Sequence, residues 1–304
     1  MLVALNRVNK FYPIMKKEIS FVKMNGAGND FVIIDARKKD IEMSKSDCRN
    51  ICDRKAGIGC DQLVIIENSN DFDCLMTIYN QDGTKSDACG NATRCVAAIL
   101  FEENSSLQQV KIKTAADILI ASRENDNMIA VKMGKIKFSW QDIPLSKEIE
   151  TQGLDLLGQK IYCANIGNPH AVIFLDKNIT DDEFYSLGSK IENDTLFPKK
   201  TNVEFAQITS DTNISARVWE RGVGETKACG SGACAIVATA IKNNLINSNK
   251  AAVSYLGGDL TIEWNGNEDD PVTMTGGYQK EFLGNISLDT TNYISYSKLD
   301  YYTN

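Results

Sequence analysis

The chain has 304 residues, of which 43% are hydrophobic and 24% are charged, and it carries a formal net charge of −7 with one histidine. This length predicts about two domains with buried cores, and the acidic balance argues against a nucleic-acid partner or an anionic membrane surface. A single histidine excludes a multi-histidine metal site and leaves one candidate base for any Ser-His or Cys-His mechanism.

The distribution of the cysteines and the first residues of the chain indicate the cytoplasm. Nine cysteines are spread through the chain without the dense spacing of a small secreted scaffold, so we expect reduced thiols in a cytoplasmic protein. No run approaches the roughly 18 apolar residues of a membrane span. Residues 1–15 lack the pattern of a secretory signal, and Met15 precedes two lysines like a native start, so we interpret 1–15 as an N-terminal extension.

The first half of the chain predicts short strands and two helices. Apolar runs rich in β-branched residues predict strands at 21–24, 31–35, 59–67 and 72–79, and later at 110–113, 118–122 and 129–133. A capping serine predicts a helix over 44–54. The helix after Cys89 is apolar on nearly every face along 95–101, so other structure should enclose it.

The second half repeats this pattern after a loop-rich stretch over 138–159. Strands are predicted at 171–175, 202–208, 214–219, 251–255, 260–264 and 272–275. A second helix, apolar on nearly every face, follows Cys229 along 233–241. We therefore expect curved sheet wrapped around each apolar helix.

A fixed offset relates the two halves. Cys229 stands 140 residues after Cys89 (229 − 89), and each thiol lies at a Gly-rich turn that leads into an apolar helix. Offsets of 139 or 140 residues also relate polar residues at turns and strand ends: Asn29 with Asn168, Gln62 with Asn202, and Asn80 with Glu220. The offset predicts an internal duplication, with two similar halves that face one another and a domain change near Gly134.

Paired thiols at helix N-termini suit one kind of reaction. Unpaired backbone N–H groups and the helix dipole favour anions there, so we expect thiol pKa values below the ordinary value of about 8.5. A thiolate and a thiol on either side of a carbon can remove a proton next to a carboxylate and return it on the opposite face. The N–H groups of Gly90, Asn91, Gly230 and Ser231 would stabilise the carbanion, so no cofactor is required.

The other polar residues fit a zwitterionic substrate. Arg221 can hold a carboxylate through two parallel hydrogen bonds. Five amides can bind amino and carboxylate groups without adding net charge: Asn29, Gln62, Asn80, Asn168 and Asn202.

The remaining cysteines have simpler interpretations. Cys48, Cys52 and Cys60 could suggest three metal ligands, but their spacing matches no standard zinc pattern, and we predict no metal. Four others are interpreted as core residues: Cys74, Cys95, Cys163 and Cys234.

Several strings in this order resemble the diaminopimelate epimerase family, at 23–31, 80–83, 88–91, 167–170 and 220–232, and the resemblance covers about residues 19–290. It implies a cofactor-independent epimerase that converts LL-2,6-diaminopimelate to the meso form in lysine and peptidoglycan precursor biosynthesis, acting as a homodimer. It also implies an α+β fold of two similar lobes. Each lobe would be a mixed β-sheet barrel around a central helix, with the active site in the cleft between them.

The resemblance also assigns roles and boundaries. Cys89 and Cys229 would be the acid and base, and His170 and Glu220 would modulate their pKa values. Substrate contacts would come from Asn29, Gln62, Asn80, Gly90, Asn91, Asn168, Asn202, Glu220, Arg221, Gly230 and Ser231. The N-terminal lobe would comprise 16–133 plus 277–292, including a returning strand near Glu281–Ser287. The C-terminal lobe would comprise 134–276, and 293–304 would form a tail.

The sequence departs from the family pattern after Asn91, where Ala92 and Thr93 stand in place of the usual glycine, and at Asn25. Alternatives remain open. The same fold could racemise or isomerise another amino acid, such as a proline derivative. The two thiols could instead form a dithiol redox switch, or the protein could bind a ligand without turnover. The residues leave open which thiol acts on which stereoisomer.

Overall fold

A computed structural model describes residues 17–39, 41–87, 89–125, 127–288 and 294–300. The predicted N-terminal extension at 1–15 lies outside the described residues. The predicted tail at 293–304 is described only at 294–300, where the chain forms β19 (Ile294–Asp300). This strand pairs with β18 (Gln279–Leu288) in antiparallel fashion. Among the described residues, no helix has the length and apolar character needed to cross a membrane.

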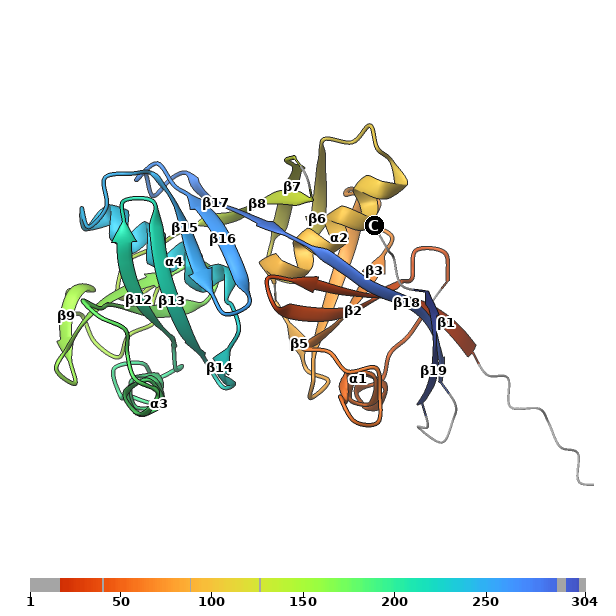
Figure 1. The fold of residues 1–304 in the computed structure, drawn as a ribbon, viewed down its shortest axis with the longest axis horizontal. Coiled ribbons are helices and arrows are strands. Elements are labelled where there is room, and N and C mark those ends of the chain that lie inside the picture. Colours follow the sequence, from red (N-terminus) through yellow and green to blue (C-terminus); the bar gives the residue numbers. More distant parts are fainter. Residues whose placement is uncertain (1–16, 40, 88, 126, 289–293, 301–304) are drawn as a thin grey trace, which may run out of the picture.

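The N-terminal lobe consists of strands wrapped around α2 (Gly90–Glu103) (Figure 1). Its strands are β1 (Lys17–Gly26), β2 (Asn29–Asp35), β3 (Gln62–Glu67), β4 (Cys74–Asn80), β5 (Lys85–Ser86), β6 (Gln109–Lys113), β7 (Ile118–Arg123), β8 (Met128–Lys135) and the returning β18. A smaller helix, α1 (Lys45–Cys52), packs outside the strands and begins at Ser44, which forms a capping box with Asp47.

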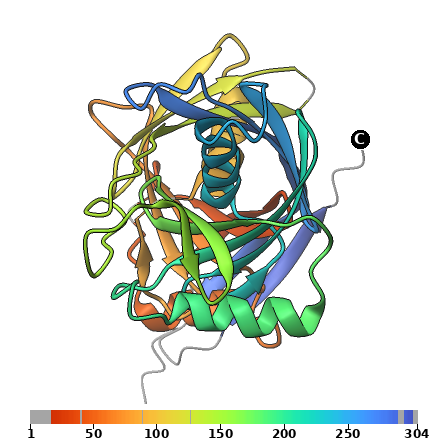
Figure 2. The same ribbon diagram turned by 90° about the vertical axis from the view of Figure 1, so that its left-hand side faces the viewer.

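The C-terminal lobe repeats this plan around α4 (Gly230–Lys242). Its strands are β9 (Gln152–Leu156), β10 (Gln159–Asn165), β11 (Pro169–Phe174), β12 (Asn202–Ser210), β13 (Asn213–Glu220), β14 (Gly224–Thr226), β15 (Lys250–Tyr255), β16 (Gly258–Glu263) and β17 (Pro271–Gly277). Figure 2 looks along α4 and shows it inside its ring of strands, with α3 (Asp181–Glu192) across the outside.

Strand pairing confirms the internal duplication. In the N-terminal lobe β2 pairs with β3 in parallel, β3 with β4 in antiparallel and β4 with β6 in parallel fashion. In the C-terminal lobe the pairs β11–β12, β12–β13 and β13–β15 follow the same sequence of directions. The register of the paired strands agrees as well. Phe31 lies opposite Gln62 in the pair β2–β3, and the residues at the corresponding positions of the second lobe, His170 and Asn202, lie opposite each other in the pair β11–β12. The lobes are therefore two copies of one topology.

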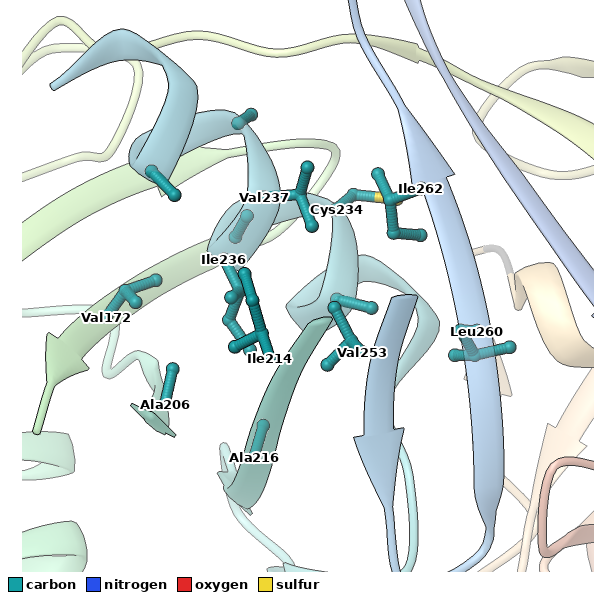
Figure 3. Packing of buried hydrophobic residues seen from close by; sticks show 14 of the residues in the cluster. Val172, Ala206, Ile214, Ala216, Cys234, Ile236, Val237, Val253, Leu260 and Ile262 are labelled. Carbon is teal, nitrogen blue, oxygen red and sulfur yellow. The ribbon is translucent and has the colours of Figure 1, made fainter. Parts of the chain in front are cut away.

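The central helices are buried on all sides, as their apolar sequences predict. Figure 3 shows Cys234, Ile236 and Val237 of α4 among side chains from the surrounding strands, including Val253 and Leu260. All five are 0% exposed, and a fully buried aliphatic side chain contributes about 1.5–3 kcal/mol to folding. Each lobe thus has its own core, built around its helix.

Two strands tie the lobes together. β8 pairs with β17 in antiparallel fashion across the boundary. β18 then leaves β17 and pairs with β1, so that Ile286 lies opposite Ile19 (Figure 1). This is the returning strand expected near Glu281–Ser287.

Six elements were not predicted, namely the strands β5, β9, β10, β14 and β19 and the helix α3. The helix α3 begins at Thr180, whose hydroxyl and the Glu183 carboxylate form a capping box, a signal that is present in the sequence. β9 lies inside the stretch expected to be loop, and β10 follows directly after it.

The four cysteines assigned to the core, Cys74, Cys95, Cys163 and Cys234, are all buried, as predicted.

Candidate active site

Each of the duplicated thiols caps a central helix. Cys89 and Cys229 are the N-cap residues of α2 and α4, and both have extended backbone angles, with φ of −150° and −133°. Neither side chain makes a capping hydrogen bond. The sulfurs therefore lie at helix N-termini without being used to satisfy the helix itself.

The two helix N-termini meet at the boundary between the lobes. A Cβ atom added at Gly230 would lie 3.3 Å from Asn91 Oδ1 and 2.8 Å from Met274 Sδ. One added at Gly90 would lie 2.6 Å from Met274 Cε and 2.8 Å from Met133 Cε. The two helix N-termini and the methionine side chains between them are therefore closely packed, and a side chain at either glycine would require the methionines to move.

A second contact between the lobes lies beside Asn29. Gly28 has a positive φ of 80°, and a Cβ there would lie 2.5 Å from Gly257 Cα in the turn between β15 and β16. Gly257 N donates to Lys227 O at 2.9 Å. The loop before β2 is therefore packed against the C-terminal lobe, close to the strand that leads into the Cys229 turn.

Cys89 is half-buried and faces an amide of its own lobe. Its Sγ lies 3.7 Å from Asn29 Oδ1. Burial raises the pKa of the Cys89 thiol to about 11, and the Glu220 carboxylate adds to the rise, whereas the N–H groups of Ala92 and Asn91 oppose it. Burial therefore favours the neutral form of the Cys89 thiol.

Cys229 is 6% exposed. Its Sγ lies 3.5 Å from Ser231 Oγ. Burial raises the pKa of the Cys229 thiol well above its ordinary value, followed by the charges of Glu220 and Glu204, while Ser231 and the Gly232 N–H oppose the rise. The prediction that helix N-termini lower both thiol pKa values is therefore wrong for this structure, because desolvation outweighs the helix N–H groups.

Glu220 is the charged residue common to both thiols, since its carboxylate raises the pKa of each. Burial raises the pKa of Glu220 itself, and a hydrogen bond from Thr226 Oγ1 at 2.5 Å opposes this. His170 lies close enough to lower the pKa of Glu220 by its charge. The structure thus places Glu220 near both thiols and His170 near Glu220, and a role of either residue in modulating the thiols stays a prediction.

His170 forms a buried chain with residues of its own lobe. Its Nδ1 lies 2.6 Å from Glu204 Oε1, and its Nε2 lies 3.0 Å from Asn168 Oδ1. His170 and Glu204 are both 0% exposed. Glu204 was not predicted, although a glutamate inside an apolar strand is a signal that something buried must pair with it.

The amides of the N-terminal lobe are held in fixed orientations. Asn29 Nδ2 donates to Asp61 Oδ2 at 2.9 Å, which turns Asn29 Oδ1 towards Cys89. Gln62 Nε2 donates to Asn80 Oδ1 at 3.0 Å, and Gln62 Oε1 is buried without a partner among the described residues. Asp61 was also missed, and it lies next in sequence to a predicted residue.

Asn202 links two segments that carry expected substrate residues of the C-terminal lobe. Asn202 Nδ2 donates to Pro169 O at 2.8 Å, and its Oδ1 accepts from Arg221 N at 2.9 Å. Asn202 therefore holds the turn that carries Arg221. Arg221 is exposed, and no ion pair involves it within the described part of the chain.

The three cysteines considered as metal ligands lie elsewhere, in the core between α1 and the strands, with Cys48 and Cys52 on α1 itself. Cys60 Sγ lies 3.4 Å from Cys52 Sγ, and both are buried together with Cys48. Over the described ranges, no group of three or more His, Cys, Asp or Glu residues has the arrangement of a metal site.

Comparison with known proteins identifies close relatives. A family model described as diaminopimelate epimerase matches residues 21–139 and 162–281. The diaminopimelate epimerase of Acidiphilium cryptum is 41% identical over 269 residues, which cover 88% of this chain and 95% of that protein. The protein of the same name from Acetivibrio thermocellus is 37% identical over 279 residues, covering 88% and 99%.

Solved structures share the fold at low identity. A hydroxyproline epimerase from Agrobacterium vitis gives a TM-score of 0.65 at 13% identity, covering 92% of this chain and 95% of that one. A phenazine biosynthesis protein of the PhzF family from Bacillus anthracis gives 0.63 at 13% identity, covering 93% and 99%. These likenesses confirm the two-lobed α+β fold.

Proposed function

The chain belongs to the diaminopimelate epimerase family, and from this membership we propose that Cys89 and Cys229 carry out its proton transfer. The protein is an isomerase that converts LL-2,6-diaminopimelate to meso-diaminopimelate. The observation that carries the assignment of the thiols is the meeting of two Cys-capped helix N-termini at the lobe boundary.

The reaction needs two groups that exchange roles. One thiolate takes the proton from the α-carbon, and the electron pair of the broken C–H bond moves into the adjacent carboxylate. The opposite thiol then gives its proton to the other face of the carbon and becomes the thiolate. The atoms balance with no further reactant, so we propose that no cofactor takes part.

The helix ends supply what the carbanion needs. Backbone N–H groups of Gly90, Asn91, Gly230 and Ser231 lie at the first turns of α2 and α4, where they can bind the negative charge that develops on the carboxylate. Cys229 is buried and Cys89 is half-buried, which limits the access of water and strengthens these interactions. A raised thiol pKa also makes the thiolate a stronger base once it forms.

We propose that the polar residues around the seam bind the two amino-acid ends of the substrate. Arg221 would hold a carboxylate, and the amides would bind amino and carboxylate groups. These residues are Asn29, Gln62, Asn80, Asn168 and Asn202, with Glu220 also in contact. Arg221 is exposed and takes part in no ion pair within the described part of the chain, which supports its role.

We further propose a cytoplasmic homodimer with lobes at 16–133 plus 277–292 and at 134–276. All nine cysteines are free thiols, which fits a reducing compartment. Light scattering on the purified protein would test the dimer, since a monomer at micromolar concentration would contradict it.

The substrate is tested by incubating the reduced protein with LL-2,6-diaminopimelate in deuterated water. We expect meso product with deuterium at the inverted carbon, because the returning proton comes from a thiol that has exchanged with solvent. Proline and hydroxyproline serve as rival substrates, since a racemase of proline derivatives has the same fold. Faster turnover of either would contradict the assigned substrate.

A further inference from the structure

The two thiols lie in lobes of the same topology but with different buried charges. In the C-terminal lobe, His170 and Glu204 form a buried pair between β11 and β12. In the N-terminal lobe, the same register positions hold Phe31 and Val64, both 0% exposed. A carboxylate therefore stands beneath one thiol where the other lobe has a valine.

Glu204 packs directly against the first turn of α4. A Cβ atom added at Gly232 would lie 2.8 Å from Glu204 Oε1 and 3.2 Å from Cys229 Cβ. Glu204 Oε2 is buried and has no hydrogen-bond partner among the described residues. The carboxylate therefore faces the helix turn that carries Cys229 and is only partly compensated by His170.

The N-terminal lobe has a buried cation instead. Arg94 of α2 is 0% exposed, and its Nε donates to Gly277 O at 3.3 Å. Its Nη1 lies 3.6 Å from Met274 Sδ, in the methionine contact between Gly90 and Gly230, and its Nη2 has no partner among the described residues. Burial lowers the pKa of the Arg94 guanidinium, and negative charge on Cys95, Cys89 or Cys234 would oppose this.

The charged and titratable groups around each thiol can be compared directly. Cys229 faces Glu220 from β13, Glu204 from β12 and Tyr255 from β15, with His170 of β11 behind Glu204. For Cys89, the charge of Glu220 from the other lobe raises the thiol pKa, and the charge of Arg94 from its own helix opposes this. Glu220 acts on both thiols, so the difference between them comes from Glu204 on one side and Arg94 on the other.

We propose that Arg94 and Glu204 are positioning residues that decide which thiol loses its proton first: Cys89 becomes the thiolate and Cys229 keeps its proton. A cation favours a nearby anion, and a carboxylate disfavours one. This rests on the proposed function, in which the two thiols share one acid and one base role. The free enzyme is then ready to take an α-proton that faces Cys89, whereas the opposite direction first requires a proton to move from Cys229 to Cys89.

Alkylation of the free, reduced protein tests this without substrate. Only thiolates react with iodoacetamide at a useful rate. The pH at which a cysteine reaches half of its maximal reaction rate therefore reports the ionisation of its thiol, even where the reagent reaches the two sulfurs at different rates. Peptide mass spectrometry reads the two sites separately. In the wild type, we expect Cys89 to reach this midpoint at lower pH than Cys229.

Two variants should move the two midpoints separately. Glu204→Gln keeps the side-chain shape and should lower the midpoint of Cys229 by about one pH unit while leaving that of Cys89 in place. Arg94→Met removes the cation with little change of volume and should raise the midpoint of Cys89. The matched control is Glu263→Gln, an exposed carboxylate paired with Lys250, which changes net charge equally and should move neither.

The opposite order of midpoints in the wild type would overturn the proposal. So would a Glu204→Gln protein whose midpoints match those of the control. If Glu204→Gln does not fold, Arg94→Met decides alone, and an unmoved Cys89 midpoint contradicts the role of Arg94. Failure of the proposed function would give a different result: the two cysteines would show the expected order of midpoints, but the protein would not epimerise the substrate.

Discussion

Replacing Gly232 by alanine probes how Glu204 packs beneath Cys229. The new methyl group would lie 2.8 Å from Glu204 Oε1, far inside normal van der Waals contact. That oxygen is held 2.6 Å from His170 Nδ1, and the carboxylate is fully buried, so it cannot move aside without weakening a buried hydrogen bond. At the duplicated position of α2 the chain already has Ala92, where Val64 takes the place of Glu204.

The magnitude follows from three opposing effects. Overpacking a buried site costs about 1–3 kcal/mol, and weakening a buried hydrogen bond costs about 1–2 kcal/mol. Alanine is better than glycine inside a helix by about 1 kcal/mol. We therefore expect Gly232→Ala to lower the free energy of unfolding by about 2 kcal/mol. In a Glu204→Ala background the methyl meets no carboxylate, so the same change should be neutral or stabilising by up to about 1 kcal/mol.

Urea unfolding followed by tryptophan fluorescence measures all four proteins of this cycle. Trp264 lies in the core around α4 and reports on the C-terminal lobe. The midpoints should shift without a change of slope. An equal effect of Gly232→Ala in both backgrounds would refute the reasoning, because it would mean that the helix turn and the Glu204 carboxylate are not in contact.

Three further predictions concern the thiols and the substrate residues. The free energy of unfolding should fall as pH rises above about 8.5, the ordinary thiol pKa in an unfolded chain. Folding raises the pKa of Cys89 to about 11 and of Cys95 to about 12, so the folded protein keeps protons that the unfolded chain loses; equal urea midpoints at neutral and alkaline pH would contradict this. Asp61→Asn should lower kcat/KM about tenfold, because asparagine keeps one acceptor oxygen where Asp61 uses two, one for Arg54 and one for the Asn29 amide that is oriented towards Cys89. Steady-state kinetics measures it, and the exposed Asp53→Asn serves as control. Arg221→Lys should raise KM about tenfold and change kcat less, since lysine cannot make two parallel hydrogen bonds to a carboxylate; an unchanged KM would remove Arg221 from the binding site.

The duplication and the central helices could be predicted because their signals are local. Cys89 and Cys229 each precede a helix that is apolar on every face, and such a helix can only be enclosed. The register of Gln62 with Asn202 then followed from a constant offset. By contrast, α3 was missed although Thr180 and Glu183 form a capping box, because the apolar pattern of an outer helix is weaker than that of a central one.

The charges around the thiols could not be predicted from the sequence. Whether a helix N-terminus lowers a thiol pKa depends on how much water the fold excludes, and this is settled by the whole structure. Glu204 and Arg94 lie inside apolar segments, and nothing local indicates which thiol each one faces. Asp61 reaches Asn29 only because β2 and β3 lie side by side.

The central claim is that Cys89 and Cys229 act on one carbon from opposite sides. Its most direct measurement is stereoinversion of LL-2,6-diaminopimelate in deuterated water by reduced Cys89→Ala and Cys229→Ala proteins, each first shown to fold like the wild type. We predict that inversion is lost in both, because each lacks either the group that removes the proton or the group that returns it. Inversion at a rate near that of the wild type in either variant would contradict the claim.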